Sequence, residues 1–492
     1  MITEALGGPA RRKVIVLLAL VLGLQSADTA TIGAAGAELE RGLGIGNTEL
    51  GLLASVTVLT GAVGSVPAGL LVDRVRRTAV LPAAIVVWSV AMLASAAAVS
   101  FLMLLVLRLA LGGVIAVASP GVASLTGDYF PARERARIFG FILAGELVGG
   151  ALGFLLSGEV AAVLSWRGAF ALLALPGFAL AWVIWRHLPE PARGGQSRLA
   201  AGASEIRSAE EVEKDTYRSS SGEEPSARPG GRAQEEVERR EISPRDELVL
   251  REAPSRVSAW RAVRYVLSIP TNRILILASA LGYFFLAGLQ TFAVVFVKGH
   301  FGISQGVATG LVALILVSSV AGAVVGGRLA DRFLDRGHVT ARIVTAAVAY
   351  VTAAAIFVPS LIVGSLALVI PLYILAAMAL AAPNAPLDAA RLDIMPSQLW
   401  GRAEGVRSVL RDLGQALAPL VFGAVSERLG SGRPTSGSAG GFGAAANSQG
   451  LEYTFLVMLS ALLLSGLVMV RARHSYPSDV ATALASEGQM AR

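Results

Sequence analysis

Twelve long apolar segments, nearly free of charge, decide what this chain can fold into. Crossing the hydrocarbon core of a bilayer as an α-helix takes about 20 apolar residues. Strands of a membrane β-barrel need only about 10 residues of alternating pattern. The sequence therefore predicts an all-α integral membrane protein with twelve transmembrane helices. The segments are residues 14–34, 50–72, 78–99, 101–125, 138–163, 169–185, 274–297, 306–327, 343–363, 366–388, 406–425 and 453–470.

The basic residues indicate how the chain is oriented. Only 16% of the residues are charged, against about 25% in a soluble domain, and Lys and Arg gather in alternate loops. Cytoplasmic loops carry the excess of Lys and Arg, so we expect both termini in the cytoplasm and a multi-pass protein of the plasma (inner) membrane. We interpret the net charge of +7 as contact with anionic lipid, not with nucleic acid. The opposite loops hold Arg41, Arg167, Lys298, Arg428 and Arg433.

Composition also divides the chain into parts. Residues 187–271 contain 14 Lys or Arg and 15 Asp or Glu, a composition that cannot bury enough apolar surface to fold. We predict a disordered cytoplasmic linker there, between six-helix bundles at 14–186 and 272–470. Its residues 257–267 have the pattern of an amphipathic helix at the membrane interface. Residues 1–13 and 471–492 are predicted as cytoplasmic tails. The Gly- and Ser-rich residues 431–450 are predicted as a flexible external loop.

Several kinds of chemistry are excluded by what the sequence lacks. Cys is absent, which removes disulfides and Cys-ligated metals. The four His residues are scattered, so no metal site is expected. No Gly-x-x-x-x-Gly-Lys-Ser/Thr string occurs, which disfavours ATP-driven pumping. We expect no cofactor, and we expect the chain to be a monomer.

A short motif occurs twice, six predicted helices apart. Both copies read Gly-x-Leu-x-Asp-Arg and lie at the ends of the second and eighth segments. An even number of intervening helices puts both copies on one membrane face, which indicates two parallel halves related by an axis along the membrane normal, as in some transporters. The repeated residues are Gly69, Asp73, Arg74 and Gly327, Asp331, Arg332.

These residues give the chain a resemblance to the major facilitator superfamily over nearly all its length outside the linker. The residues Gly69, Leu71, Asp73, Arg74 and Arg77 match that family's signature between helices 2 and 3. The resemblance implies two six-helix bundles that transport a substrate by alternating access. Arg108, with Gly112 and Gly113, resembles its helix 4 pattern. Gly145, Gly149 and Gly153 resemble its helix 5 antiporter signature, with Gly150 in place of the usual proline.

Other stretches are similar to the Spinster-like branch, which is associated with lysolipids and sphingoid lipids. They are residues 128–130, 149–154, 166–167, 175–177 and 188–191. The chain departs from that branch at two positions: Asp28 is followed by Thr29 instead of Arg, and Ile115 stands where the branch has an acidic residue.

Burying a charged group within the bilayer costs free energy, so each such residue is expected to have a functional or structural role. Asp28 lies in the middle of the first segment, near Gln25, and is interpreted as a proton carrier or as a structural partner of Arg108. Arg108 either binds an anionic group of the substrate when Asp28 is protonated or forms a fixed ion pair. Glu146 is a second candidate proton carrier, or a helix-packing residue.

Further polar residues are candidates for the substrate cavity and for gating. Tyr283 and Gln290 are uncharged cavity candidates. In the eleventh segment Arg407 and Arg411 share a helix face, while the adjacent Asp412 is expected to point elsewhere. The resemblance implies that Arg407 or Arg411 forms a latch with Asp73; the alternative is that these side chains extend to the inner leaflet.

The sequence favours a secondary active transporter that is coupled to protons and moves an amphipathic small molecule. Efflux of a drug-like or lipid-like compound is the preferred specification. Uptake or facilitated transport of a small organic anion is the alternative. A non-transporting sensor or scaffold that recruits a partner through the linker belongs to a different class. A membrane enzyme is disfavoured, since no nucleophile, metal site or acid–base pair clusters outside the apolar segments.

Overall fold

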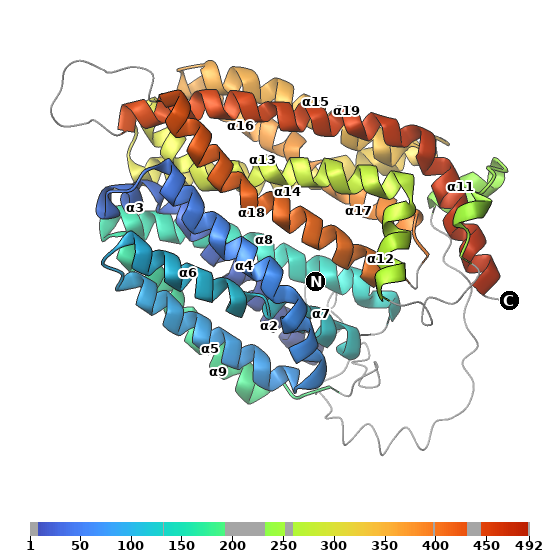
Figure 1. The fold of residues 1–492 in the computed structure, drawn as a ribbon, viewed down its shortest axis with the longest axis horizontal. Helices are drawn as coiled ribbons and strands as arrows, with labels where there is room; N and C mark the ends of the chain where they lie inside the picture. The colour runs from blue at the N-terminus through green and yellow to red at the C-terminus, as the bar shows by residue number, and fades with distance from the viewer. Residues whose placement is uncertain are drawn as a thin grey trace. The chain divides into compact units, whose positions relative to one another are not determined.

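The computed structural model describes residues 8–130, 132–191, 232–250, 259–396, 399–430 and 444–490 (Figure 1). All regular elements within these ranges are helices. Those before the predicted linker are α2 (Pro9–Ala34), α3 (Gly36–Leu43), α4 (Asn47–Arg74), α5 (Arg77–Ala96), α6 (Phe101–Ile115), α7 (Ala118–Tyr129), α8 (Ala132–Val163) and α9 (Trp166–His187). Those from residue 259 onward are α12 (Ala259–Ser268), α13 (Pro270–Phe301), α14 (Gln305–Asp335), α15 (Ala341–Ile362), α16 (Leu366–Ala381), α17 (Asn384–Asp393), α18 (Trp400–Gly430) and α19 (Ala444–Met490).

Eleven stretches within the described residues are helical, long and apolar enough to cross a membrane. The twelfth predicted segment, 406–425, is helical as part of α18, but it is not among the eleven. Its charged residues Arg407, Arg411 and Asp412 explain the low apolarity. The segment 101–125 is interrupted between Ile115 and Ala118, because Pro120 has no N–H to offer the carbonyl of residue 116 and its ring crowds that carbonyl.

The chain forms two compact units. The first contains α2 to α9 together with Gln290–Lys298 and Ile303–Ala313, the segments on either side of the α13–α14 turn. The second contains Ala227–Leu289, Gly299–Gly302 and Leu314–Arg492. The division of the chain at residue 226 falls within the predicted linker.

Close helix packing organises the first unit. α2 packs along α8, and α5 lies beside α9 (Figure 1). A Cβ on Gly149 of α8 would overlap the backbone of Gly23 in α2, and a Cβ on Gly153 would overlap Ala27. Small residues allow two helix backbones to approach this closely, which is a common basis of helix association in membranes. This contact places α8 directly against the helix that carries Asp28.

The prediction of an unfolded linker over 187–271 is wrong for part of that range. Residues 188–191 follow α9 and contact α5, and Arg232–Arg239 form a further helix, α11. A short 3₁₀ turn follows at Asp246–Leu248, and α12 occupies most of the predicted amphipathic helix at 257–267. Composition misled the prediction because this segment is held by distant residues, which accept its hydrogen bonds and bury its few apolar side chains, such as Ala233. Residues 192–231 lie outside the described residues.

Two further predicted regions differ in part from the structure. Of the predicted external loop 431–450, residues 431–443 lie outside the described residues, whereas 444–450 form the first turns of α19. α19 then continues through the predicted C-terminal tail to Met490.

Candidate functional site

The first unit buries an ion pair between α2 and α6. Nη1 of Arg108 donates to Oδ1 of Asp28 at 2.8 Å, and both side chains are 0% exposed. The guanidinium also lies over the ring of Phe170, with Cζ 4.6 Å from its centroid. The structure thus brings together two of the predicted site residues and adds an aromatic ring that sequence reasoning missed.

Close packing of α6 against α4 fixes the position of Arg108. A Cβ on Gly112, one turn further along α6, would overlap Thr60. The hydroxyl of Thr57 donates to the backbone carbonyl of Arg108 at 3.5 Å. Gly112 of the helix 4 pattern therefore helps to position Arg108, because a larger side chain would push α6 away from α4.

The ion pair leaves several polar atoms unused. Within the described part of the chain, Nε and Nη2 of Arg108 and Oδ2 of Asp28 are buried without a hydrogen-bond partner. Gln25, one turn before Asp28, likewise has an unpartnered Oε1. In a guanidinium, Nε–H and one N–H of Nη2 point the same way and form the edge that binds a carboxylate through two hydrogen bonds. Asp28 binds Nη1 and leaves this edge without a hydrogen-bond partner.

The other predicted cavity residues lie at several places. Glu146 is a half-buried residue of α8, in the turn that begins with Gly145. Gln290 belongs to the first unit, where its backbone carbonyl touches Gly33 of α2. Tyr283 belongs to the second unit, and its ring lies 5.1 Å below Cζ of Arg411.

The predicted latch is not tested by the structure. Gly69 and Asp73 belong to α4, but the surroundings of Gly69 and the side chain of Asp73 lie outside what the structure describes. Arg407 is buried. Arg411 donates from Nε to Oδ1 of Asp412 at 2.8 Å. The prediction that Asp412 points away from Arg411 is therefore wrong, since neighbouring side chains of this length can bend toward each other. Of the remaining signature residues, Arg74 ends α4, and the last turns of α14 contain Gly327, Asp331 and Arg332.

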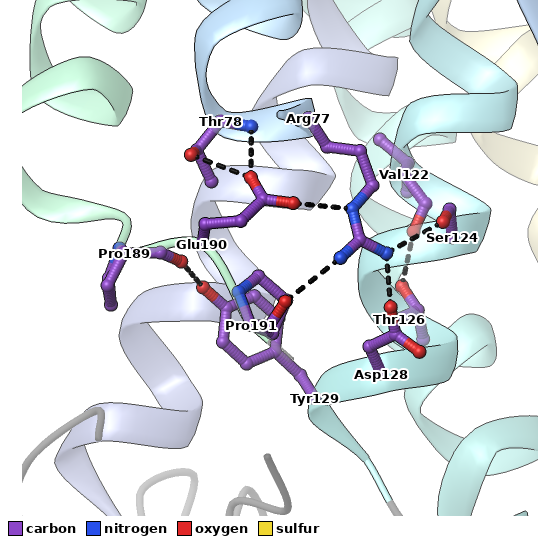
Figure 2. Close-up of polar contacts among 10 residues, drawn as sticks. All are labelled: Arg77, Thr78, Val122, Ser124, Thr126, Asp128, Tyr129, Pro189, Glu190 and Pro191. Carbon is purple, nitrogen blue, oxygen red and sulfur yellow. Dashed lines mark hydrogen bonds and ion pairs between the residues drawn. The ribbon is translucent and has the colours of Figure 1, made fainter. Parts of the chain in front are cut away.

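Arg77, the last residue of the loop signature, is the centre of a buried cluster at the start of α5 (Figure 2). Its Nε donates to Oε1 of Glu190 at 2.8 Å, and its Nη2 donates to the carbonyl of Pro191 at 3.0 Å. Its Nη1 donates to Ser124 at 2.9 Å and also binds Asp128. One side chain therefore joins the start of α5, the end of α7 and the segment after α9.

Glu190 closes this cluster from the opposite side. Its Oε2 accepts hydrogen bonds from the backbone N–H and the hydroxyl of Thr78, both at 2.8 Å. Burial raises the pKa of Glu190, but the hydrogen bonds from Thr78 and Arg77 and the charge of Arg77 outweigh it, so the pKa is lowered from its usual value. Sequence reasoning cited Glu190 and Asp128 only as part of a resemblance and missed their joint contact with Arg77.

The second unit contains an equivalent cluster. Arg342, at the start of α15, binds Asp393, at the end of α17. In each unit the paired Arg and Asp are 51 residues apart in the sequence. The third group differs: in the first unit Glu190 accepts from Arg77, whereas in the second unit the hydroxyl of Tyr476 in α19 donates to Asp393. This structural repeat agrees with the two halves inferred from the doubled motif.

No group of three or more His, Asp or Glu side chains within the described ranges is arranged to hold a metal ion. The buried ion pair and the two clusters are therefore the chemical features from which a function can be inferred.

Comparison with known proteins identifies relatives. Residues 18–419 match the family model of the Major Facilitator Superfamily. The chain is 30% identical over 185 residues to a 4-hydroxybenzoate transporter of Pseudomonas aeruginosa, covering 38% of this chain and 41% of that protein. It is 31% identical over 196 residues to a gallate transporter of Pseudomonas putida, covering 40% and 43%. The aligned part thus spans about two-fifths of these curated relatives.

A solved structure shares the fold over most of the chain. It is a bacterial homologue of the human lysosomal transporter Spinster in an inward-facing, unoccupied conformation. The TM-score is 0.73 at 19% identity, with 96% of this chain and 98% of that chain covered.

Proposed function

Because the chain belongs to the major facilitator superfamily and is a multi-pass membrane transporter, we propose that it carries a small organic anion whose carboxylate binds Arg108. The observation that carries the proposal is the Nε and Nη2 edge of the buried guanidinium, which has no hydrogen-bond partner. A carboxylate on this edge would satisfy both donors at once, which is the geometry arginine offers better than lysine.

The surroundings of Arg108 favour an anion with a flat, partly apolar body. Phe170 covers one part of the guanidinium, and aromatic rings pack well against other rings. Two of the relatives are named for 4-hydroxybenzoate and gallate, and a Bacillus subtilis relative, 28% identical over 172 residues, is named for hexuronate. All three compounds carry a carboxylate. These features favour the organic anion, the alternative in the sequence analysis, over a drug-like or lipid-like compound.

We further propose that Asp28 carries the coupling proton. Ionised Asp28 neutralises Arg108 in the absence of substrate. When a substrate carboxylate binds the guanidinium, two anions compete for one cation, which favours protonation of Asp28. Substrate and proton would then bind together, as a symporter requires. The proposed location is the plasma (inner) membrane, with both termini in the cytoplasm, in accord with the Lys and Arg distribution.

The test is uptake of radiolabelled 4-hydroxybenzoate, gallate and a hexuronate into proteoliposomes under an imposed proton gradient, with a lysolipid as the competing substrate class. We expect accumulation of at least one of the anions. Arg108→Lys keeps the charge but loses the two-bond edge, so uptake should fall about tenfold or more, since a charged hydrogen bond contributes about 1.5–3 kcal/mol. Movement of the lysolipid with none of the anions would refute the proposal.

Proton coupling is tested by Asp28→Asn, with Glu146→Gln as the matched control. Asp28→Asn mimics the protonated acid permanently and should abolish gradient-driven accumulation while substrate exchange continues. Glu146→Gln should accumulate substrate like the wild type. Loss of accumulation in Glu146→Gln alone would place the proton site on α8, and an effect of neither change would exclude proton coupling through these two acids.

A further inference from the structure

Residues 232–250, which lie within the charged region 187–271 and belong to the second unit, bind the last turns of α19. The backbone N–H of Arg245 donates to the hydroxyl of Thr482 at 2.9 Å, and the N–H of Leu250 donates to Ser486 at 3.0 Å. Thr482 and Ser486 are one turn apart and buried. Each hydroxyl also donates to the carbonyl four residues before it in α19. The hydroxyl protons are thus used within the helix, and the lone pairs accept the two backbone donors.

The beginning of the same segment binds the turn between α14 and α15. Ala233 of α11 is completely buried against Leu334 and Ala341. Arg240 donates to the carbonyl of Gly337 and pairs with Glu236. Gly337 has a φ of 87°, a backbone conformation that favours glycine. Residues 232–250 therefore contact two parts of the second unit that are distant in the sequence.

These contacts flank the Arg342–Asp393–Tyr476 cluster. Ala341, which α11 covers, directly precedes Arg342. Asp479 lies one turn after Tyr476 on α19, and its Oδ1 is 3.5 Å from Nε of Arg245. In the first unit, the segment that follows α9 closes the equivalent cluster by binding Arg77. α19 instead continues as a helix past Tyr476, so it supplies no such returning segment.

We propose that residues 232–250 act as a strap that closes the second unit over the Arg342–Asp393–Tyr476 cluster, the role that residues 188–191 have for Arg77. The surface formed by the α14–α15 turn and the last turns of α19 is thus a peptide-binding surface, and its occupant is this chain's own segment. This inference is independent of which substrate is carried.

The test is hydrogen exchange of the purified full chain, read by mass spectrometry on peptides from 232–250 and from the last turn of α17, residues 390–393. Thr482→Val removes one acceptor, and Ser486→Ala provides a second variant. Each change should speed exchange of the strap amides about three- to tenfold, since one hydrogen bond contributes about 0.5–1.5 kcal/mol. The last turn of α17 should also exchange faster, because it carries Asp393.

Thr454→Val is the matched control. Thr454 is a buried residue of the same helix and makes the same hydrogen bond to the carbonyl four residues before it. It should leave both peptides unchanged. The proposal is overturned if the strap amides of the wild type exchange as fast as those of a free peptide. It is equally overturned if Thr482→Val and Ser486→Ala match Thr454→Val, or if they loosen the strap while the last turn of α17 keeps its protection.

Discussion

Replacing Arg77 with Gln measures what the cluster of Figure 2 contributes to the first unit. Arg77 is 2% exposed and pairs with two carboxylates that are 14% and 16% exposed. Removing one partner of a buried ion pair costs about 3–5 kcal/mol, because the remaining charge stays buried. The residual exposure of Asp128 and Glu190 places this case near the lower limit, at about 3 kcal/mol. A unit of this size loses roughly 2–4 °C per kcal/mol, so we expect a melting temperature about 6–12 °C lower.

The pH dependence gives this prediction a second readout. A carboxylate whose pKa is lower in the folded state stabilises the fold above its ordinary pKa, and this contribution is lost as the pH falls through the folded pKa. Glu190 is such a group, and Arg77 is one cause of its lowered pKa. Arg77→Gln removes that cause. The difference in melting temperature between wild type and variant should therefore be largest at neutral pH and decrease in acid.

Thermal unfolding of the purified protein in detergent at neutral and acidic pH is the assay. Arg76→Gln is the matched control, because Arg76 is the exposed neighbour of Arg77 in the same loop. It should melt within about 2 °C of the wild type, since surface substitutions usually change stability by less than about 0.5 kcal/mol. The reasoning is refuted if Arg77→Gln melts with Arg76→Gln, or if its deficit is the same at both pH values.

Three further predictions concern topology, the latch and helix packing. A Cys introduced at Ser220 should resist impermeant thiol reagents in intact cells and one at Ser438 should react, against a background free of native Cys; the reverse pattern would overturn the orientation. Asp73→Asn should slow transport roughly five- to tenfold, the effect of about 1–1.4 kcal/mol on a barrier, with unchanged protein levels in the membrane; normal turnover would leave Asp73 without a role in gating. Gly149→Leu should destabilise the first unit by about 1–3 kcal/mol in thermal unfolding, because α2 leaves no room for the side chain. Gly140→Leu, where the space is open, should not, and equal melting of the two variants would contradict the packing argument.

The membrane fold could be predicted because the bilayer imposes a simple requirement. Each long apolar segment must satisfy its backbone internally and therefore becomes a helix. Eleven of the twelve predicted segments meet the criteria for a span within the described residues, and α18 provides the twelfth as a helix. The pairing of Asp28 with Arg108 was likewise predictable, since a buried charge needs a counter-charge. Which nitrogens of the Arg108 guanidinium remain without a hydrogen-bond partner depends on the angle between α2 and α6. No sequence pattern encodes that angle.

The order of residues 232–250 could not be predicted from composition. Charged, Gly- and Pro-rich segments stay unfolded when they must rely on their own apolar surface. Here the partners are Thr482 and Ser486, more than 230 residues away in the sequence. A single Thr or Ser in a helix gives no indication that its lone pairs hold another segment, so the strap became visible only in the structure.

The two Arg–Asp clusters were predictable in part, because the sequence contains a signal for the pairing of each Arg with its Asp. Arg77 and Asp128 are separated by 51 residues, and so are Arg342 and Asp393. Arg77 and Arg342 each begin a predicted helix, and each Asp ends the next one, so both partners must come to the same membrane face. Comparing the halves by the spacing of opposite charges, as well as by the Gly-x-Leu-x-Asp-Arg motif, would have paired them. The third partners would still have been missed, because Glu190 and Tyr476 differ in chemistry. This difference has a structural consequence: in the first unit the third partner accepts from the arginine, whereas in the second it donates to the aspartate. Both clusters therefore contain a carboxylate as acceptor, but only the first contains two.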